Sequence, residues 1–128
     1  MEYTLKKSLG QHFLKDENVC KRIVDELKKL DFDRLLEVGP GGGALTKYLV
    51  KIGEIDFRAV ELDDEKVIFL EKAFPALRGK IITENFLDID PPFKESFTVV
   101  GNFPYNISTE ILFKVIEWKQ QVPSVIGM

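Results

Sequence analysis

Apolar residues along the chain recur first at helical spacing and then in short continuous runs. Val19, Ile23, Leu27 and Leu30 lie three or four residues apart, which predicts an amphipathic helix, and Asp16 is a suitable N-cap for it. From residue 34 onward, short apolar runs alternate with longer helical patterns. Such alternation is typical of a sheet whose parallel strands are joined by right-handed helical crossovers.

Five strands and three further helices follow from this pattern. The strands are expected at residues 34–38, 57–61, 80–83, 97–101 and from 124 onward, and the helices at 44–52, 64–74 and 108–118. Gly53 and Pro75 are stop signals for the first two helices, and Ser108 is a suitable N-cap for the third. We therefore predict one α/β domain over residues 1–128, with an N-terminal arm over residues 1–15. Its doubly wound, mainly parallel sheet stops in or just after the fifth strand, so we expect an incomplete sheet.

Composition narrows the class of protein. The chain has 128 residues, of which 45% are hydrophobic, and this is ordinary for a globular domain. No apolar run approaches the roughly 20 residues of a membrane span, and the N-terminus lacks the apolar stretch of a signal peptide. Cys20 is the only cysteine, which excludes an intramolecular disulfide and a cysteine-based metal site. We expect a cytoplasmic protein that has no membrane contact.

The charge of the chain is distributed unevenly. The net charge of −3 argues mildly against nucleic-acid binding, because such domains usually carry a basic surface. Residues 1–30, however, hold seven basic and five acidic side chains, so this part carries a net charge of +2. Contact with a polyanion is therefore expected through the N-terminal arm, at Lys6, Lys7 and Lys15.

A glycine-rich segment follows the first strand and opens the next helix, where a nucleotide-type ligand is expected at the carboxyl end of the sheet. Gly39, Gly41 and Ala44 fit the dinucleotide pattern G-x-G-x-x-G/A. Glu61 lies 22 residues after Gly39, where an acid could hold the ribose hydroxyls of NAD or of S-adenosylmethionine. Glu37 favours the latter, because an acid just before the first glycine suits a cationic ligand and repels a pyrophosphate.

The segment Gly-Asn-Phe-Pro-Tyr-Asn at residues 101–106 ends the fourth strand and is the most specific feature of the chain. An exocyclic amine on a base is a poor nucleophile, because its lone pair is delocalised into the ring. The side-chain oxygen of Asn102 and the backbone carbonyl of Pro104 could accept its two N–H groups and localise that lone pair. Tyr105 could hold the base by stacking, which is worth about 1–3 kcal/mol. To reach such a pocket, the base must leave its stack or come from a single strand.

Four segments of the chain resemble, in order, the motifs of a known family. They are Ser-Leu-Gly-Gln-His-Phe-Leu at 8–14, Leu-Glu-Val-Gly-Pro-Gly-Gly-Gly-Ala-Leu-Thr at 36–46, Val-Glu-Leu-Asp at 60–63 and Gly-Asn-Phe-Pro-Tyr-Asn-Ile-Ser at 101–108. Together they resemble the ribosomal RNA adenine dimethyltransferases of the KsgA type, relatives of the Erm resistance methyltransferases. The Gln-His-Phe-Leu and Asn-Phe-Pro-Tyr parts are specific, whereas the glycine loop is generic.

The resemblance implies a Rossmann-like class I methyltransferase with S-adenosylmethionine as its cofactor. It implies methyl transfer to N6 of two adjacent adenosines near the 3′ end of small-subunit rRNA, late in assembly of the subunit. The partner would be the immature small ribosomal subunit, with no metal; we expect no oligomer. The family also adds a helical C-terminal domain that this chain lacks, so we expect little or no activity from the 128 residues alone.

The resemblance also implies a role for each matching residue. The methionine side of the cofactor would be lined by Gln11, His12 and Leu14, and the loop at Gly39 and Gly41 would leave room for it. Glu61 would bind the ribose of the cofactor. Asn102 would contact both the cofactor and the target amine, and Tyr105 would stack on the target adenine. In relatives, an Asp in the loop after the third strand usually accepts a hydrogen bond from the adenine amino group of the cofactor. At the corresponding position this chain most closely offers Asn85. Asp88 and Asp90 lie near enough to be alternatives for that contact.

Four alternatives stay open at the level of the sequence. They are an Erm-like enzyme for large-subunit rRNA, a DNA adenine methyltransferase, an NAD-dependent oxidoreductase, and a non-catalytic assembly factor of the ribosome. The Gln-His-Phe-Leu arm favours RNA over DNA, and the Asn-Phe-Pro-Tyr segment has no role in an oxidoreductase.

Overall fold

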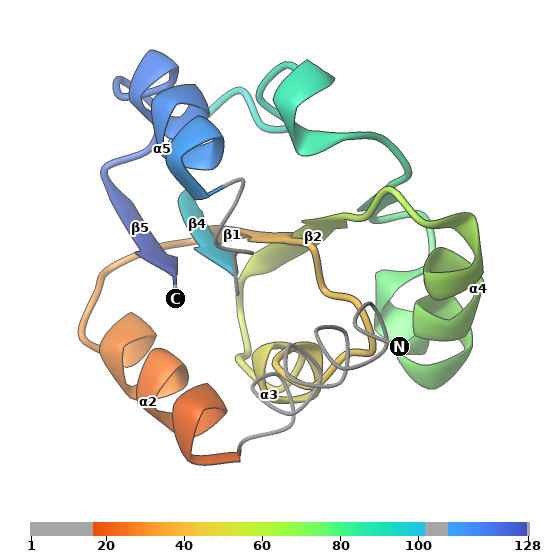
Figure 1. The fold of residues 1–128 in the computed structure, drawn as a ribbon. Helices are drawn as coiled ribbons and strands as arrows, with labels where there is room; N and C mark the ends of the chain where they lie inside the picture. The colour runs from red at the N-terminus through yellow and green to blue at the C-terminus, as the bar shows by residue number, and fades with distance from the viewer. Residues whose placement is uncertain (1–16, 102–107, 128) are drawn as a thin grey trace, which may run out of the picture.

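The computed structural model describes residues 17–101 and 108–127, which form a five-stranded sheet with helices on both of its faces (Figure 1). The strands are β1 (Arg34–Val38), β2 (Asp56–Val60), β3 (Ile81–Ile82), β4 (Thr98–Gly101) and β5 (Ser124–Gly127). The helices are α2 (Glu17–Lys28), α3 (Thr46–Leu49), α4 (Asp64–Ala73) and α5 (Ser108–Glu117), with 3₁₀ turns η1 (Pro75–Leu77) and η2 (Phe86–Asp88). The five predicted strands and the alternation with helices are confirmed.

All neighbouring strands are parallel, in the order β3-β2-β1-β4-β5. The chain therefore moves outward from β1 to β3, returns to the other side of β1 with β4, and continues outward to β5. This reversal is the doubly wound arrangement that was predicted, and its switch point lies between β1 and β4. Within the described residues, the outer edge of β5 is paired with no further strand.

The alternation of side chains along β1 distributes them to two apolar clusters. Leu36 and Val38 face a cluster built with α5, η2 and residues 89–97, whose largest member is Trp118. Leu35 faces the other cluster, built with α2, α3 and η1. Figure 1 shows the same division, with α5 on one side of the sheet and α2 and α3 on the other. Both faces of the sheet are covered, as a parallel sheet requires.

Several element boundaries differ from the predicted ones. The helix expected over residues 44–52 is α-helical only over Thr46–Leu49, and turns precede and follow it. β3 has only two residues, and β2 begins at Asp56, one residue before the predicted start. β1, at the centre of the sheet, pairs with five residues of β2 on one edge and with four residues of β4 on the other, whereas β3 pairs with only two residues of β2.

No helix among the described residues has both the length and the apolar character needed to cross a membrane.

Candidate functional site

The predicted site residues that the structure describes lie at or after the carboxyl ends of β1, β2 and β3. Val38 pairs with Val60 on one side and with Gly101 on the other, so three loops leave the sheet at the same edge. The backbone N–H of Gly39 donates to the carbonyl of Val60 at 2.9 Å, which joins the glycine loop to the end of β2. Glu61 donates its backbone N–H to the carbonyl of Ile82 at 2.9 Å, which adds the end of β3 to this edge. Parallel α/β sheets bind their ligands at this end.

The glycine loop turns back toward β2 through left-handed backbone conformations. Gly39, Gly41 and Gly43 have φ values of 69°, 56° and 85°. At Gly43 a second constraint applies, because a Cβ there would lie 2.7 Å from the Cε2 atom of Phe74. Among the described residues, no atom lies within 4 Å of a Cβ placed at Gly39, so only its positive φ favours glycine there. Gly43 was not singled out in the sequence, because a packing contact with residue 74 has no local signal.

Glu61 fastens the glycine loop to the beginning of α4. Its Oε1 accepts the backbone N–H of Gly41 at 2.9 Å, and its Oε2 accepts that of Asp63 at 3.1 Å. The residue is buried, with 8% of its surface exposed. Each carboxylate oxygen has a second lone pair, so these contacts leave capacity for two ligand hydroxyls. The structure thus brings together Glu61 and Gly41, as the sequence predicted.

Glu37 lies at the end of β1 on the face that carries α3. The hydroxyl of Thr46 donates to its Oε1 at 2.6 Å. Both side chains are buried, with 2% of Glu37 and 0% of Thr46 exposed. Burial raises the pKa of Glu37 to about 8; the Thr46 hydrogen bond opposes this shift and the negative charge of Glu61 adds to it. Thr46 is a site residue that the sequence analysis did not identify, although it begins the helix that follows the glycine loop.

Two exposed side chains follow the ends of β2 and β3. Leu62 follows Glu61 and is 64% exposed, which places an apolar surface beside the acid. Asn85 follows the end of β3 and caps η2, where its Oδ1 accepts the backbone N–H of Leu87 at 3.0 Å. Asn85 therefore has a local structural role, and its contact with the cofactor adenine stays a prediction, as do the alternatives Asp88 and Asp90.

Six predicted site residues lie outside the described residues: Gln11, His12, Leu14, Asn102, Pro104 and Tyr105. The same is true of Asp16 and of the three lysines of the arm. Two observations fix where these segments join the described part. Gly101, which precedes Asn102, pairs with Val38. Glu17 at the start of α2 forms an ion pair with Lys47, with 2.6 Å between Oε1 and Nζ.

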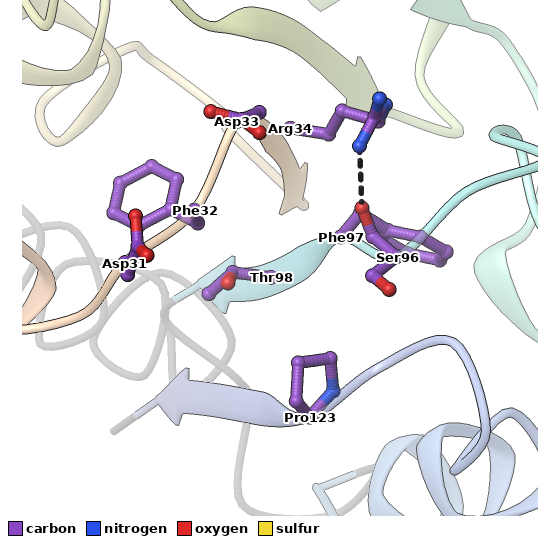
Figure 2. A pocket seen from close by; sticks show the side chains of 8 residues that line it. All are labelled: Asp31, Phe32, Asp33, Arg34, Ser96, Phe97, Thr98 and Pro123. Atoms are coloured by element: carbon purple, nitrogen blue, oxygen red, sulfur yellow. Dashed lines mark hydrogen bonds between the residues drawn. The ribbon is translucent and has the colours of Figure 1, made fainter.

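A pocket of about 200 Å³ lies at the opposite edge of the sheet, where β1, β4 and β5 begin (Figure 2). Its lining residues are Asp31, Phe32, Asp33, Arg34, Ser96, Phe97, Thr98 and Pro123. Arg34 spans one side, where its Nη1 donates to the carbonyl of Ser96 at 3.2 Å and its Nη2 lies 3.1 Å from an oxygen of Glu95. None of the predicted site residues lines this pocket.

Residues 2–128 match the family model described as "Ribosomal RNA adenine dimethylase". Among curated proteins, "Ribosomal RNA small subunit methyltransferase A" of Parabacteroides distasonis is 49% identical over 125 residues, which cover 96% of this chain and 47% of that protein. The protein of the same name from Cytophaga hutchinsonii is 45% identical over 126 residues, or 96% of this chain and 49% of that protein. The chain spans about half the length of these relatives.

Solved structures show the same fold. The 23S rRNA methyltransferase ErmE matches with a TM-score of 0.64 and 27% identity, over 86% of this chain and 43% of that one. A dimethyladenosine transferase from Plasmodium falciparum matches with a TM-score of 0.66 and 22% identity, over 80% of this chain and 38% of that one. The predicted class I methyltransferase fold is thereby confirmed. With its family motifs spread over the whole match, the chain belongs to the ribosomal RNA adenine dimethylase family.

Proposed function

We propose that this chain is the cofactor-binding part of an rRNA adenine N6-dimethyltransferase that uses S-adenosylmethionine. Its target is two adjacent adenosines near the 3′ end of small-subunit rRNA, in the immature subunit in the cytoplasm. The observation that carries the proposal is the pairing of Glu61 with the glycine loop, in a chain whose relatives are named small-subunit rRNA methyltransferases. The 45–49% identity to those relatives, against 27% to ErmE, favours the small over the large subunit.

The chemistry of the described residues fits this cofactor better than a dinucleotide. Glu61 offers two carboxylate oxygens to the ribose hydroxyls, and Leu62 offers an apolar surface to the adenine ring. Glu37 accepts a neutral hydroxyl from Thr46 and takes part in no ion pair within the described part of the chain, so it suits a cation. A pyrophosphate at the same edge would face two carboxyl groups, which would oppose its binding by charge repulsion whenever they are ionised.

When bound, the cofactor supplies a methyl group made electrophilic by a sulfonium sulfur. The chain's own residues would position the adenine amine for attack on that methyl carbon. Asn102 and Pro104 would accept the two N–H groups, so that the nitrogen lone pair forms the new N–C bond while the S–C electron pair returns to sulfur. The amine proton is lost after attack, when it is acidic, so no strong base is needed. Positioning of this kind contributes up to about 7–11 kcal/mol in well-oriented reactions.

Calorimetric titration of the chain with S-adenosylmethionine tests the cofactor assignment, with NAD as the competing ligand. Glu61→Ala should weaken binding at least tenfold. Glu95→Ala, an exposed acid near the opposite edge of the sheet, is the matched control and should bind like the wild type. Circular dichroism confirms that each variant is folded. Binding of NAD in place of S-adenosylmethionine would decide for an oxidoreductase.

Mapping of dimethyladenosine in both rRNAs, from cells with and without the gene, tests the target. Marks that disappear from the small-subunit RNA support the proposal, and loss from the large-subunit RNA supports the Erm-like alternative. In the same cells, Asn102→Ala should abolish the marks. An Asn102→Ala protein that does not methylate but still supports subunit assembly would show that a separate assembly role coexists with catalysis. We also propose that the 128 residues alone methylate subunits poorly or not at all, which a turnover assay on undermethylated subunits measures.

A further inference from the structure

Two acidic side chains at the carboxyl edge of the sheet differ sharply in how they are held. Glu61 accepts one backbone N–H group on each of its two carboxylate oxygens. Glu37 accepts the hydroxyl of Thr46, and none of the ion pairs among residues 17–101 and 108–127 involves it. The buried acid is therefore left with a neutral donor, whereas the less buried one is bonded on both oxygens.

The surroundings of Glu37 disfavour a negative charge. In the strand register it lies beside Ala59 of β2 and Val100 of β4, and α3 presents the Thr46 hydroxyl. Within residues 17–101 and 108–127, the charged group whose field reaches Glu37 is Glu61, which carries the same sign. A buried carboxylate without a cationic partner is costly, so such a group keeps its proton until a positive charge arrives.

We propose that Glu37 is a proton-linked receptor for the positive charge of the cofactor: it carries a proton when the cation is absent and releases it when the cation binds. The inference rests on the proposed function, because the cation is the sulfonium or the ammonium group of S-adenosylmethionine. Burial raises the pKa of Glu37 to about 8, which agrees with a proton held at neutral pH.

Proton release by Glu37 would couple cofactor affinity to pH, and this coupling can be measured. Where Glu37 is protonated in the free protein and ionised in the complex, one proton leaves for each cofactor bound. The affinity then rises about tenfold for each unit of pH. The rise should be visible from pH 6 to 7.5 and should flatten above pH 8, where the free protein has already lost the proton.

The test is calorimetric titration of wild-type protein with S-adenosylmethionine at pH 6.0, 6.5, 7.0 and 7.5, in two buffers that differ in their enthalpy of ionisation. The difference between the buffers gives the number of protons released. We expect about one proton and an affinity that rises about tenfold per pH unit. The α-amino group of the ligand titrates near pH 8, so Glu37→Gln serves as the reference, and it should remove the release and most of the pH dependence.

Thr46→Val supplies a second variant if Glu37→Gln does not fold. It removes the hydroxyl that favours the charged form, so the rise in affinity should extend to higher pH than in the wild type. Binding by the wild type without proton release, or equal release by Glu37→Gln, overturns the inference and leaves the proposed function intact. Absence of S-adenosylmethionine binding at every pH overturns the proposed function, and this inference with it.

Discussion

Glycine is favoured at position 43 for two reasons, its positive φ and the lack of space for a Cβ, and the two can be measured separately. Replacement by Ala meets two obstacles there. The φ of 85° is unfavourable for a residue with a Cβ, at a cost of about 1–2 kcal/mol. The new Cβ would also lie 2.7 Å from the ring of Phe74 and 3.4 Å from a methyl of Leu70, and overpacking of this kind costs about 1–3 kcal/mol. The lower entropy of the unfolded chain returns about 0.4–1 kcal/mol. We expect Gly43→Ala to lower the free energy of unfolding by about 2–4 kcal/mol.

Two neighbouring glycines provide graded controls. Gly39 has a φ of 69°, but no atom of the described residues lies within 4 Å of a Cβ there, so Gly39→Ala should cost only about 1 kcal/mol. Gly42 has no positive φ, and the described part of the chain places no atom within 4 Å of a Cβ there, so Gly42→Ala should be neutral or slightly stabilising. The assay is urea unfolding at 25 °C, in which a loss of 2–4 kcal/mol lowers the midpoint by about 1–2 M at a slope of about 2 kcal/mol/M.

A double-mutant cycle isolates the steric part. In a Phe74→Leu background the ring edge is gone, so Gly43→Ala should cost about 1–2 kcal/mol less than in the wild type. The reasoning is refuted if Gly43→Ala and Gly42→Ala have equal midpoints. It is also refuted if the cost at Gly43 does not depend on the residue at position 74.

Three further predictions concern the stability of the cofactor-free chain. Because Glu37 keeps its proton to about pH 8 when folded and loses it near pH 4.5 when unfolded, the unfolded state binds fewer protons between these values. The free energy of unfolding should therefore fall by at most about 5 kcal/mol as pH rises through this window. Urea unfolding of Glu37→Gln should not show that fall. Equal pH dependence of the free energy of unfolding in the two proteins would contradict this prediction. Asp63 caps α4 by accepting the N–H groups of Glu65 and Lys66, so Asp63→Ala should lower the urea-derived stability by about 1 kcal/mol, and Asp63→Asn should retain most of it. On the same helix, Leu70→Ala should lower the free energy of unfolding by about 2–5 kcal/mol, because Leu70 is fully buried. Phe69→Ala should lower it much less, because Phe69 is 52% exposed. Equal thermal midpoints of the two variants would show that α4 is packed differently.

Much of the fold was predictable because its signals are local. Short apolar runs and helical spacing indicated every strand and the helices between them, and strand alternation indicated a parallel sheet. From this it followed that Glu37, Gly39, Gly41 and Glu61 would meet, since the carboxyl ends of parallel strands lie at one edge. The family motifs indicated the cofactor for the same residues.

The tertiary structure decided what depends on neighbours that are distant in the sequence. No periodicity shows that the Thr46 hydroxyl meets Glu37, or that a Cβ at Gly43 would touch Phe74. Burial between β2, β4 and α3 turns Glu37 from an ordinary acid into one that holds its proton, because the cost of a charge depends on what surrounds it in three dimensions. The sequence by itself determined that Glu37, the glycine loop and Glu61 lie at one edge of the sheet. Packing between distant residues determined the contacts of Thr46 and Gly43 and the environment that raises the pKa of Glu37.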